Sequence, residues 1–235
     1  MMKKLVAALV VALLAVSALA NEAAVKKAVE AKLNFKVDGV RRTPYLGLYE
    51  VTSGSDVIYT DEKVTYFFAG NVIDVATKKN LTQERVRQLS AIKFSDLPLE
   101  NAVKMVRGNG KRVIATFEDP NCTYCKRLAK DLATMDNVTI YTFLYPILSQ
   151  DSYDKAKAVW CAADRGKAWQ DLMVQGTAPA GKGDCDTPLE KNLALGQKLK
   201  VTGTPTIFLT NGERVPGAVP LAELEQMLAK AGGGK

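Results

Sequence analysis

The chain has 235 residues, of which 47% are hydrophobic and 24% charged, a composition typical of a globular protein with one large domain or two modest ones. The formal net charge is +7, but lysines and arginines are scattered among acidic residues without aromatic interleaving, which indicates a solvated surface rather than a nucleic-acid interface. Histidine is absent, which excludes Cys-His proteases, Ser-His-Asp hydrolases and His-ligated zinc or copper.

Residues 1–20 have the pattern of a signal peptide. Lys3 and Lys4 precede an apolar run over residues 5–16, and Ala18-Leu19-Ala20 supplies the small residues of a cleavage site. The run is shorter than the roughly 20 residues of a membrane-spanning helix, so we expect cleavage after Ala20 rather than a membrane anchor. The mature protein would then occupy an oxidising compartment, most simply the bacterial periplasm, without stable membrane insertion.

The pattern over residues 21–80 indicates a small domain that is mostly sheet. A short amphipathic helix is predicted over residues 22–34. Turn clusters separate five strand-like runs, which are Phe35–Val40, Tyr45–Val51, Val57–Tyr59, Val64–Phe68 and Val72–Val75. A domain of about 60 residues buries little surface by itself, and an oligomer interface would supply the missing burial.

A helix is predicted over residues 81–94, with Thr82 as its N-cap and an end before Pro98. It is either a core helix of the second domain or a connecting helix between domains. Its many charged side chains favour the second interpretation, a linker over residues 81–98.

From residue 99 onward the pattern alternates as in an α/β unit. The strands are predicted at 112–117, 138–144 and 206–209, and the last is followed by a type I′ turn at Asn211-Gly212 and by Arg214-Val215. Single helices are predicted at 99–106, at 122–135, from a capping box at 187–190 to about 200, and at 220–229, and more than one helix is predicted through 153–173.

Cys122-Thr123-Tyr124-Cys125 is a C-x-x-C pair between a predicted strand and a predicted helix. Asp119-Pro120-Asn121 turns the chain, so that Cys122 falls at the helix N-terminus, where unpaired N–H groups and the helix dipole favour thiolate. Cys125 shares an apolar helix face with three later residues, Leu128, Leu132 and Met135. We therefore expect an exposed nucleophile at Cys122 and an inward-pointing partner at Cys125. An inert structural disulfide is the alternative, which the strand-to-helix position disfavours.

The order of elements resembles the thioredoxin fold, with the C-x-x-C pair between strand and helix and Thr204-Pro205 just before the hairpin. This resemblance implies that Pro205 is cis. It also implies that Pro205 and Thr204 lie against the active-site sulfurs.

The match extends to the periplasmic DsbC type of protein disulfide isomerase. It is closest in Phe117–Leu128, Val159–Ala163 and Val201–Gly217 and covers nearly the whole mature chain. The resemblance implies an α/β (overall α+β) protein in which residues 21–80 form a homodimerisation domain, 81–98 a helical linker and 99–235 a thioredoxin-like catalytic domain with a helical insertion. The implied partners are misfolded exported proteins with non-native disulfides, bound in the cleft of the dimer, and a DsbD-type membrane reductase. No cofactor is implied.

Two positions depart from the pattern of these relatives. The dipeptide between the cysteines is Thr123-Tyr124 rather than Gly-Tyr, and this dipeptide is one determinant of redox potential. Position 116, where thioredoxins hold a buried acid six residues before the first cysteine, is Thr. Glu118 is a nearby acid that can replace it.

The other two cysteines, Cys161 and Cys185, are expected to form a structural disulfide. Cys161 lies on a predicted helix and Cys185 follows a glycine-rich loop, so a bridge would tie a flexible insertion to its domain. A bridge between Cys161 and Cys185 would close a loop of 23 intervening residues. In the chain-entropy model, closing such a loop stabilises the fold by roughly 3 kcal/mol. Four thiolates can also bind zinc, but zinc sites usually pair two C-x-x-C units, so we expect no metal.

The predicted function is reshuffling of incorrect disulfides. The Cys122 thiolate attacks a client disulfide, and the released client thiol or Cys125 then resolves the mixed disulfide. Thr204, Pro205, Thr123 and Tyr124 are the expected substrate contacts, and a chaperone activity is compatible with this role. Two alternatives remain open: a monomeric DsbA-type thiol oxidase, and a holdase chaperone whose cysteines are incidental.

Overall fold

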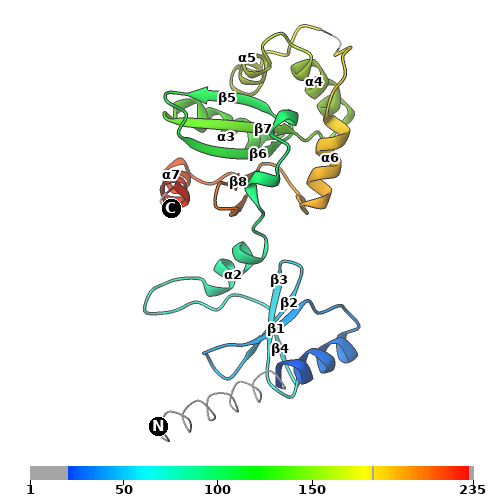
Figure 1. The fold of residues 1–235 in the computed structure, drawn as a ribbon, viewed down its shortest axis with the longest axis vertical. Coiled ribbons are helices and arrows are strands. Elements are labelled where there is room, and N and C mark those ends of the chain that lie inside the picture. The colour runs from blue at the N-terminus through cyan, green and yellow to red at the C-terminus, as the bar shows by residue number, and fades with distance from the viewer. Residues whose placement is uncertain (1–20, 182, 233–235) are drawn as a thin grey trace, which may run out of the picture. The chain divides into compact units, whose positions relative to one another are not determined.

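The computed structural model describes residues 21–181 and 183–232. The expected signal peptide, residues 1–20, lies outside the described residues. The chain divides between Ser90 and Ala91 into two units, blue to blue-green and green to red in Figure 1. Each unit has its own sheet, and the expected mixture of helix and sheet is confirmed.

The first unit is a four-stranded antiparallel sheet in the order β1-β2-β3-β4. Its strands are Gly39–Arg42 (β1), Tyr49–Ser53 (β2), Asp56–Thr60 (β3) and Phe67–Phe68 (β4). Residues 21–33 are helical, and their buried Val25 and Val29 pack in one core with residues of the sheet: Val37, Tyr49, Val51 and Val64. This core is small, as expected from the length of the unit.

Four of the five strand predictions in this unit are wrong in extent. Residues 35–38 and 64–66 lie outside the strands, because β1 begins at Gly39 and β4 at Phe67. Residues 45–48 form a turn before β2, because Leu46 and Gly47 both adopt positive φ and Thr43 N donates to Leu48 O. Residues 72–75 contribute a single bridge, Ile73 to Asn80, rather than a strand.

Helix α2, Leu81–Leu89, packs on the first unit. Its N-cap is Asn80, whose side chain accepts from Gln83 N, so the prediction of Thr82 as the cap is wrong. The Thr82 hydroxyl is instead buried and lies 2.7 Å from Tyr59 Oη of β3. A helix through residue 94 is also wrong, because Ile92 donates its N–H to Gly212 O and not to a helix carbonyl.

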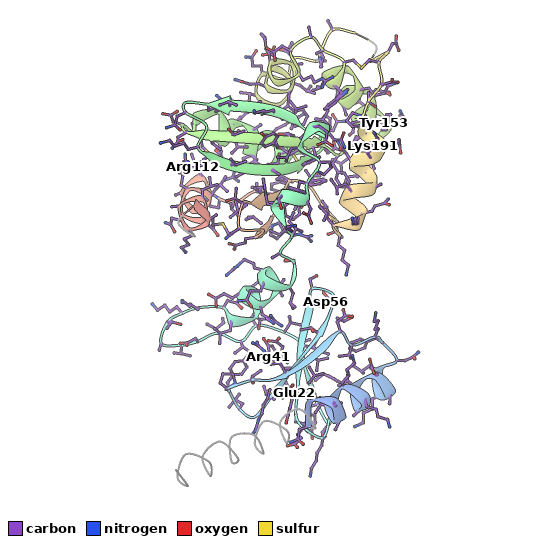
Figure 2. All side chains as sticks on the ribbon, in the orientation of Figure 1. Glu22, Arg41, Asp56, Arg112, Tyr153 and Lys191 are labelled. Atoms are coloured by element: carbon purple, nitrogen blue, oxygen red, sulfur yellow. A yellow bond between two sulfur atoms is a disulfide. The ribbon has the colours of Figure 1, made fainter. Side chains whose placement is uncertain are left out.

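A buried carboxylate joins α2 to the sheet. Glu50 on β2 is 1% exposed, and its two oxygens accept from Arg41 Nη2 and Arg85 Nε, each at 2.7 Å. Arg41, labelled in Figure 2, comes from β1 and Arg85 from α2. A buried charge is tolerated when it is paired and hydrogen-bonded, so this triad fixes the position of α2 within the first unit.

The second unit is built on a five-stranded sheet in the order β5-β7-β6-β8-β9, in which only β6 and β7 are parallel. Its strands are Val103–Arg107 (β5), Arg112–Glu118 (β6), Val138–Leu144 (β7), Thr206–Leu209 (β8) and Arg214–Pro216 (β9). The predicted helix 99–106 is wrong. A 3-10 turn, Leu99–Asn101 (η2), leads into β5, whose alternating burial and pairing with β7 define a strand.

Helices cover both faces of this sheet. Ile114, Ile140 and Ile207 face α3 (Thr123–Thr134) and α7 (Leu221–Gly232) in one core cluster. Phe117, Phe143 and Phe208 face the other way, where side chains of α6 (Leu189–Lys198) and of the 3-10 turns η1 (Phe94–Asp96) and η2 pack on them. The sheet is therefore the middle of three layers.

The insertion is helical as predicted, over residues 150–175 rather than 153–173, and is divided into three elements. They are α4 (Gln150–Trp160), α5 (Arg165–Gln170) and the π-helical turn η3 (Asp171–Gln175). Helix α6 has Pro188 at its N-cap position without a side-chain cap bond, so the predicted capping box does not form. The β8–β9 loop is not a type I′ turn, because Gly212 has positive φ (+85°) and Asn211 does not.

Candidate active site

Three chain segments meet at one edge of the second sheet. Strands β6 and β7 are parallel and end at Glu118 and Leu144, while β8 runs antiparallel to β6 and begins at Thr206. The loops after β6 and β7 and the loop before β8 therefore lie side by side. The C-x-x-C pair follows the first of these loops.

The loop before Cys122 is held by a buried carboxylate. Asp119 is fully buried, and its Oδ1 accepts from Asn121 N at 2.7 Å and from Ser152 Oγ at 2.8 Å. Its Oδ2 accepts from Leu148 N at 2.9 Å. One side chain thus fixes the turn into α3 against the loop that follows β7.

Cys122 is the N-cap residue of α3, as the turn chemistry predicts. Its Sγ accepts from Cys125 N at 3.2 Å and lies 3.3 Å from Thr204 O. The expectation of an exposed sulfur is wrong in degree: Cys122 is 6% exposed, because the Thr204–Pro205 loop packs against it. Backbone N–H groups at a helix N-terminus are suited to stabilising negative charge on this sulfur.

Cys125 points into the core, as predicted. It is fully buried on the same helix face as Leu128 and Leu132. Burial raises the pKa of the Cys125 thiol far above its usual value, and the nearby charge of Glu118 raises it further. The Cys125 thiol is therefore protonated at neutral pH and needs a base before it can act as a nucleophile.

Glu118 is a buried acid beside this thiol. Thr116 Oγ1 donates to its Oε1 at 2.7 Å, and its Oε2 has no hydrogen-bond partner within residues 21–181 and 183–232. Burial raises the pKa of the Glu118 carboxyl to about 7, against the opposing effect of hydrogen bonds from Thr116 and Thr142. The carboxyl also lines a cavity of about 10 Å³ under α3, wide enough for one water molecule.

The predicted substrate contacts surround Cys122. Thr123 and Tyr124 are exposed in the first turn of α3, and Tyr124 is 65% exposed. The Thr204–Pro205 peptide bond is cis, Pro205 is buried and Thr204 is half-buried. All four residues thus lie at the edge that holds the sulfur.

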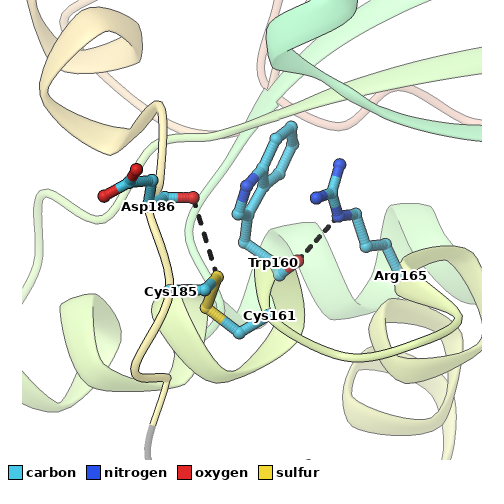
Figure 3. The surroundings of a disulfide bond; sticks show 5 residues. All are labelled: Trp160, Cys161, Arg165, Cys185 and Asp186. Atoms are coloured by element: carbon cyan, nitrogen blue, oxygen red, sulfur yellow. Dashed lines mark hydrogen bonds between the residues drawn. A yellow bond between two sulfur atoms is a disulfide. The ribbon is translucent and has the colours of Figure 1, made fainter.

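Cys161 and Cys185 form a disulfide apart from the C-x-x-C pair. Cys161 is the C-cap residue of α4, and Figure 3 shows the bridge from there to the segment before α6. The Cys185 sulfur lies 3.6 Å from Asp186 O, and Arg165 stacks on the ring of Trp160 at 3.8 Å while its Nε donates to Trp160 O. The bridge closes the insertion that contains α5 and η3.

In the part of the chain that the structure describes, side chains form no cluster of three or more metal-ligating residues. None of its helices is both long and apolar enough to cross a bilayer.

The thioredoxin-like fold, together with a cysteine pair at the strand-to-helix junction, defines a thiol-disulfide oxidoreductase. A family model described as a thioredoxin-like domain matches residues 99–232, and one described as the disulfide bond isomerase protein N-terminal domain matches residues 16–83. The chain belongs to the DsbC family of thiol:disulfide interchange proteins.

Named relatives agree with this assignment. The chain is 55% identical over 194 residues to the probable thiol:disulfide interchange protein DsbC of Bordetella parapertussis, which covers 83% of this chain and 69% of that protein. It is 30% identical to DsbC of Escherichia coli over 217 residues, which cover 89% of this chain and 88% of that protein. A crystal structure of a disulfide interchange protein from Neisseria gonorrhoeae matches 58% of this chain and 99% of that one, at 41% identity and a TM-score of 0.56.

Proposed function

We propose that this protein is a periplasmic disulfide isomerase that acts on exported proteins with incorrect disulfides. The observation that supports it best is the asymmetry of the pair. Cys122 lies at a helix N-terminus and touches the Thr204 carbonyl, whereas the Cys125 thiol is sealed in the core with a raised pKa. Such a pair separates the attacking sulfur from the resolving sulfur.

The first step is attack of the Cys122 thiolate on a client disulfide. A bond forms between Cys122 and one client sulfur, and the other client sulfur leaves as thiolate. If that thiolate then attacks a different client disulfide, and a client thiolate finally displaces Cys122, the client is rearranged with no net oxidation or reduction. Thr204 and Pro205 would hold the client chain beside the sulfur.

The second route uses Cys125 to release a trapped client. Cys125 attacks the Cys122 sulfur, the client leaves as a thiol, and the protein becomes oxidised by two electrons. Glu118 takes the Cys125 proton in this step, because its carboxyl has a pKa of about 7, is buried beside the thiol and has a free acceptor oxygen. A DsbD-type membrane reductase would return the pair to the reduced state.

The first unit would join two copies of the chain. Exposed large apolar side chains are numerous in its described residues: Leu33, Leu46, Tyr66, Phe67, Phe68, Ile73 and Val75. Phe67 and Phe68 form the edge strand β4, and an exposed apolar edge strand favours pairing with another chain. A homodimer would cover this surface, and part of it left open would give the protein a chaperone activity toward unfolded clients.

The test is the refolding of scrambled ribonuclease by the purified mature protein in glutathione buffer. The Cys122→Ala variant should lose isomerisation entirely, because Cys122 is the attacking sulfur. The matched Cys125→Ala variant should keep the first attack and accumulate mixed disulfides that a denaturing gel detects. Full activity of the Cys122→Ala variant would exclude the mechanism, and a monomeric protein that only oxidises dithiols would favour a DsbA-type role.

A further inference from the structure

The side-chain amide of Asn121, the residue directly before Cys122, is hydrogen-bonded to helix α4 through both its nitrogen and its oxygen. Its Nδ2 donates to Asp151 Oδ2 at 2.7 Å and to Ser152 Oγ at 3.0 Å. Its Oδ1 accepts from Lys155 Nζ at 2.9 Å. These partners lie on the first two turns of α4, so the amide joins that helix to the turn that carries Cys122.

Two of these partners also pair with each other. Lys155 Nζ donates to Asp151 Oδ2 at 2.6 Å across one turn of α4, and the two side chains are 30% and 64% exposed. Hydrogen bonds from Lys155 and then from Asn121 hold the pKa of the Asp151 carboxyl below its usual range, so this group is charged at neutral pH. We call Asn121, Asp151 and Lys155 the polar clamp.

The polar clamp fixes a turn rather than a core. A partly exposed ion pair contributes little to the free energy of unfolding. The backbone of Asn121 is held as well, because its N–H donates to Asp119 Oδ1 at 2.7 Å. The same oxygen accepts from Ser152 Oγ of α4 at 2.8 Å. The side chain and the backbone of Asn121 are thus both tied to α4, which fixes the point from which Cys122 starts.

The position of Cys122 matters most when the pair is reduced. The structure contains the pair as two free thiols, and the Cys122 sulfur accepts from the N–H of Cys125 at 3.2 Å. This contact depends on the turn before α3, because no covalent bond joins the two sulfurs. In the oxidised pair the S–S bond itself would hold Cys122 against Cys125.

We propose, resting on the function proposed above, that the polar clamp stabilises the reduced pair relative to the disulfide, with Asn121 as a positioning residue for Cys122. A constraint that one state of an equilibrium needs and the other does not shifts the equilibrium toward the first state. Attack on a client disulfide requires the reduced pair. The polar clamp therefore keeps more of the protein in the form that can begin isomerisation.

The equilibrium of the mature protein with glutathione measures this effect. Two electrons pass from the reduced pair to oxidised glutathione, which becomes two thiols while Cys122 and Cys125 form a disulfide. Acid quenching, alkylation and peptide mapping give the reduced fraction at each glutathione ratio. In the Asn121→Ala variant the equilibrium should lie about fivefold further toward the disulfide, which is the effect of one hydrogen bond of typical net strength.

A second variant tests the other side of the polar clamp. Lys155→Met keeps the length of the side chain but removes the ammonium group that donates to Asn121, so it should shift the equilibrium in the same direction. Lys157→Met is the matched control, because it removes the same charge from another partly exposed lysine of α4. The control should leave the equilibrium unchanged.

The melting temperature of the reduced proteins separates positioning from stability. A lower melting temperature with an unchanged glutathione equilibrium in Asn121→Ala would mean a structural role alone and would overturn this inference. Equal shifts in Lys155→Met and Lys157→Met would overturn it too, since charge alone would then explain them. If Asn121→Ala does not fold, the two lysine variants decide. An unaltered protein whose pair does not exchange with glutathione would overturn the proposed function and the inference with it.

Discussion

The Cys122 sulfur and the Thr204 carbonyl oxygen lie 3.3 Å apart, although they come from loops on different strands. A thiol in this position can donate to the carbonyl, whereas a thiolate loses that bond and keeps the N–H of Cys125. The contact also shields the sulfur, which leaves Cys122 only 6% exposed. Only a small part of Cys122 is therefore open to a reactant.

Selective alkylation tests this asymmetry. In the reduced native protein, iodoacetamide at pH 7 should modify one thiol, at Cys122, because Cys125 is fully buried and its pKa is raised. Peptide mapping by mass spectrometry measures the site. In denaturant both cysteines should react, which serves as the control. Modification of Cys125 before Cys122 in the native protein would contradict the assignment of roles.

Glu118→Gln should slow the resolving step. With Cys122 first converted to its mixed disulfide with 2-nitro-5-thiobenzoate, attack by Cys125 releases the coloured thiolate. We expect this release to be about a hundredfold slower in the variant at pH 7, since general-base catalysis is typically of that order or larger. In the unaltered protein the release rate should show an inflection near pH 7, because the pKa of the Glu118 carboxyl is about 7. This inflection should be absent in the variant. Glu190→Gln is the control, and an unchanged rate profile in Glu118→Gln would remove Glu118 from the mechanism.

The same carboxyl should make stability depend on pH. Its pKa is raised from 4.5 to about 7 on folding, so the unfolded chain loses this proton first as pH rises. The favourable contribution of the protonated group is fully present below pH 4.5 and is lost by about pH 7. The difference between the two pKa values corresponds to a contribution of about 3 kcal/mol to the free energy of unfolding. Urea unfolding should therefore show the stability difference between Glu118→Gln and the unaltered protein shifting in favour of the variant from pH 5 to pH 8. A constant difference would contradict the buried, protonated acid.

Charge on the edge strand of the first unit should prevent dimerisation. Phe67→Asp with Phe68→Asp replaces the exposed side chains of β4 with like charges, which repel across any pairing with a second copy. Light scattering should then report a monomer and the unaltered protein a dimer. Val106→Asp, on the other unit, is the matched control. A dimer of unchanged stability in the double variant would place the interface elsewhere.

Loss of the second disulfide should weaken the catalytic unit without removing its nucleophile. Cys161→Ser with Cys185→Ser opens the bridge that closes the insertion, and the expected loss of unfolding free energy is roughly 3 kcal/mol. Thermal unfolding measures this loss, and labelling of Cys122 measures the retained site. An unaltered melting temperature would show that the bridge has no structural role.

The local features of the site could be predicted from sequence. A strand, a turn of Asp119-Pro120-Asn121 and an apolar stripe suffice to place Cys122 at a helix start and Cys125 inside, because each depends on neighbours within one turn. Contacts between distant segments could not be predicted from the sequence. The shielding of Cys122 needs Thr204, and the partners of Asp119 come from the loop after β7.

The errors in secondary structure have the same origin. The sequence does not distinguish helix from strand at β5, because a stretch such as Val103–Arg107 has no decisive period, and its pairing with β7 makes it a strand. Thr82 is a good N-cap residue by type, but its hydroxyl is used by Tyr59 of β3. In both cases a tertiary contact overrides local preference.

The hydrogen bond from Ile92 N to Gly212 O has a consequence for the order of folding. Gly212 allows this close approach because it has no side chain. A Cβ at this position would lie 2.0 Å from Ile92 O. The segment that opens the second unit is thus anchored to the last hairpin, and β6 also lacks its β8 neighbour until that hairpin exists. A chain that emerges from its N-terminus can complete the first unit early, whereas the second must wait for nearly its final residues. Until then its two active-site thiols stand in an unfinished sheet, open to the same mispairing that the finished enzyme would correct.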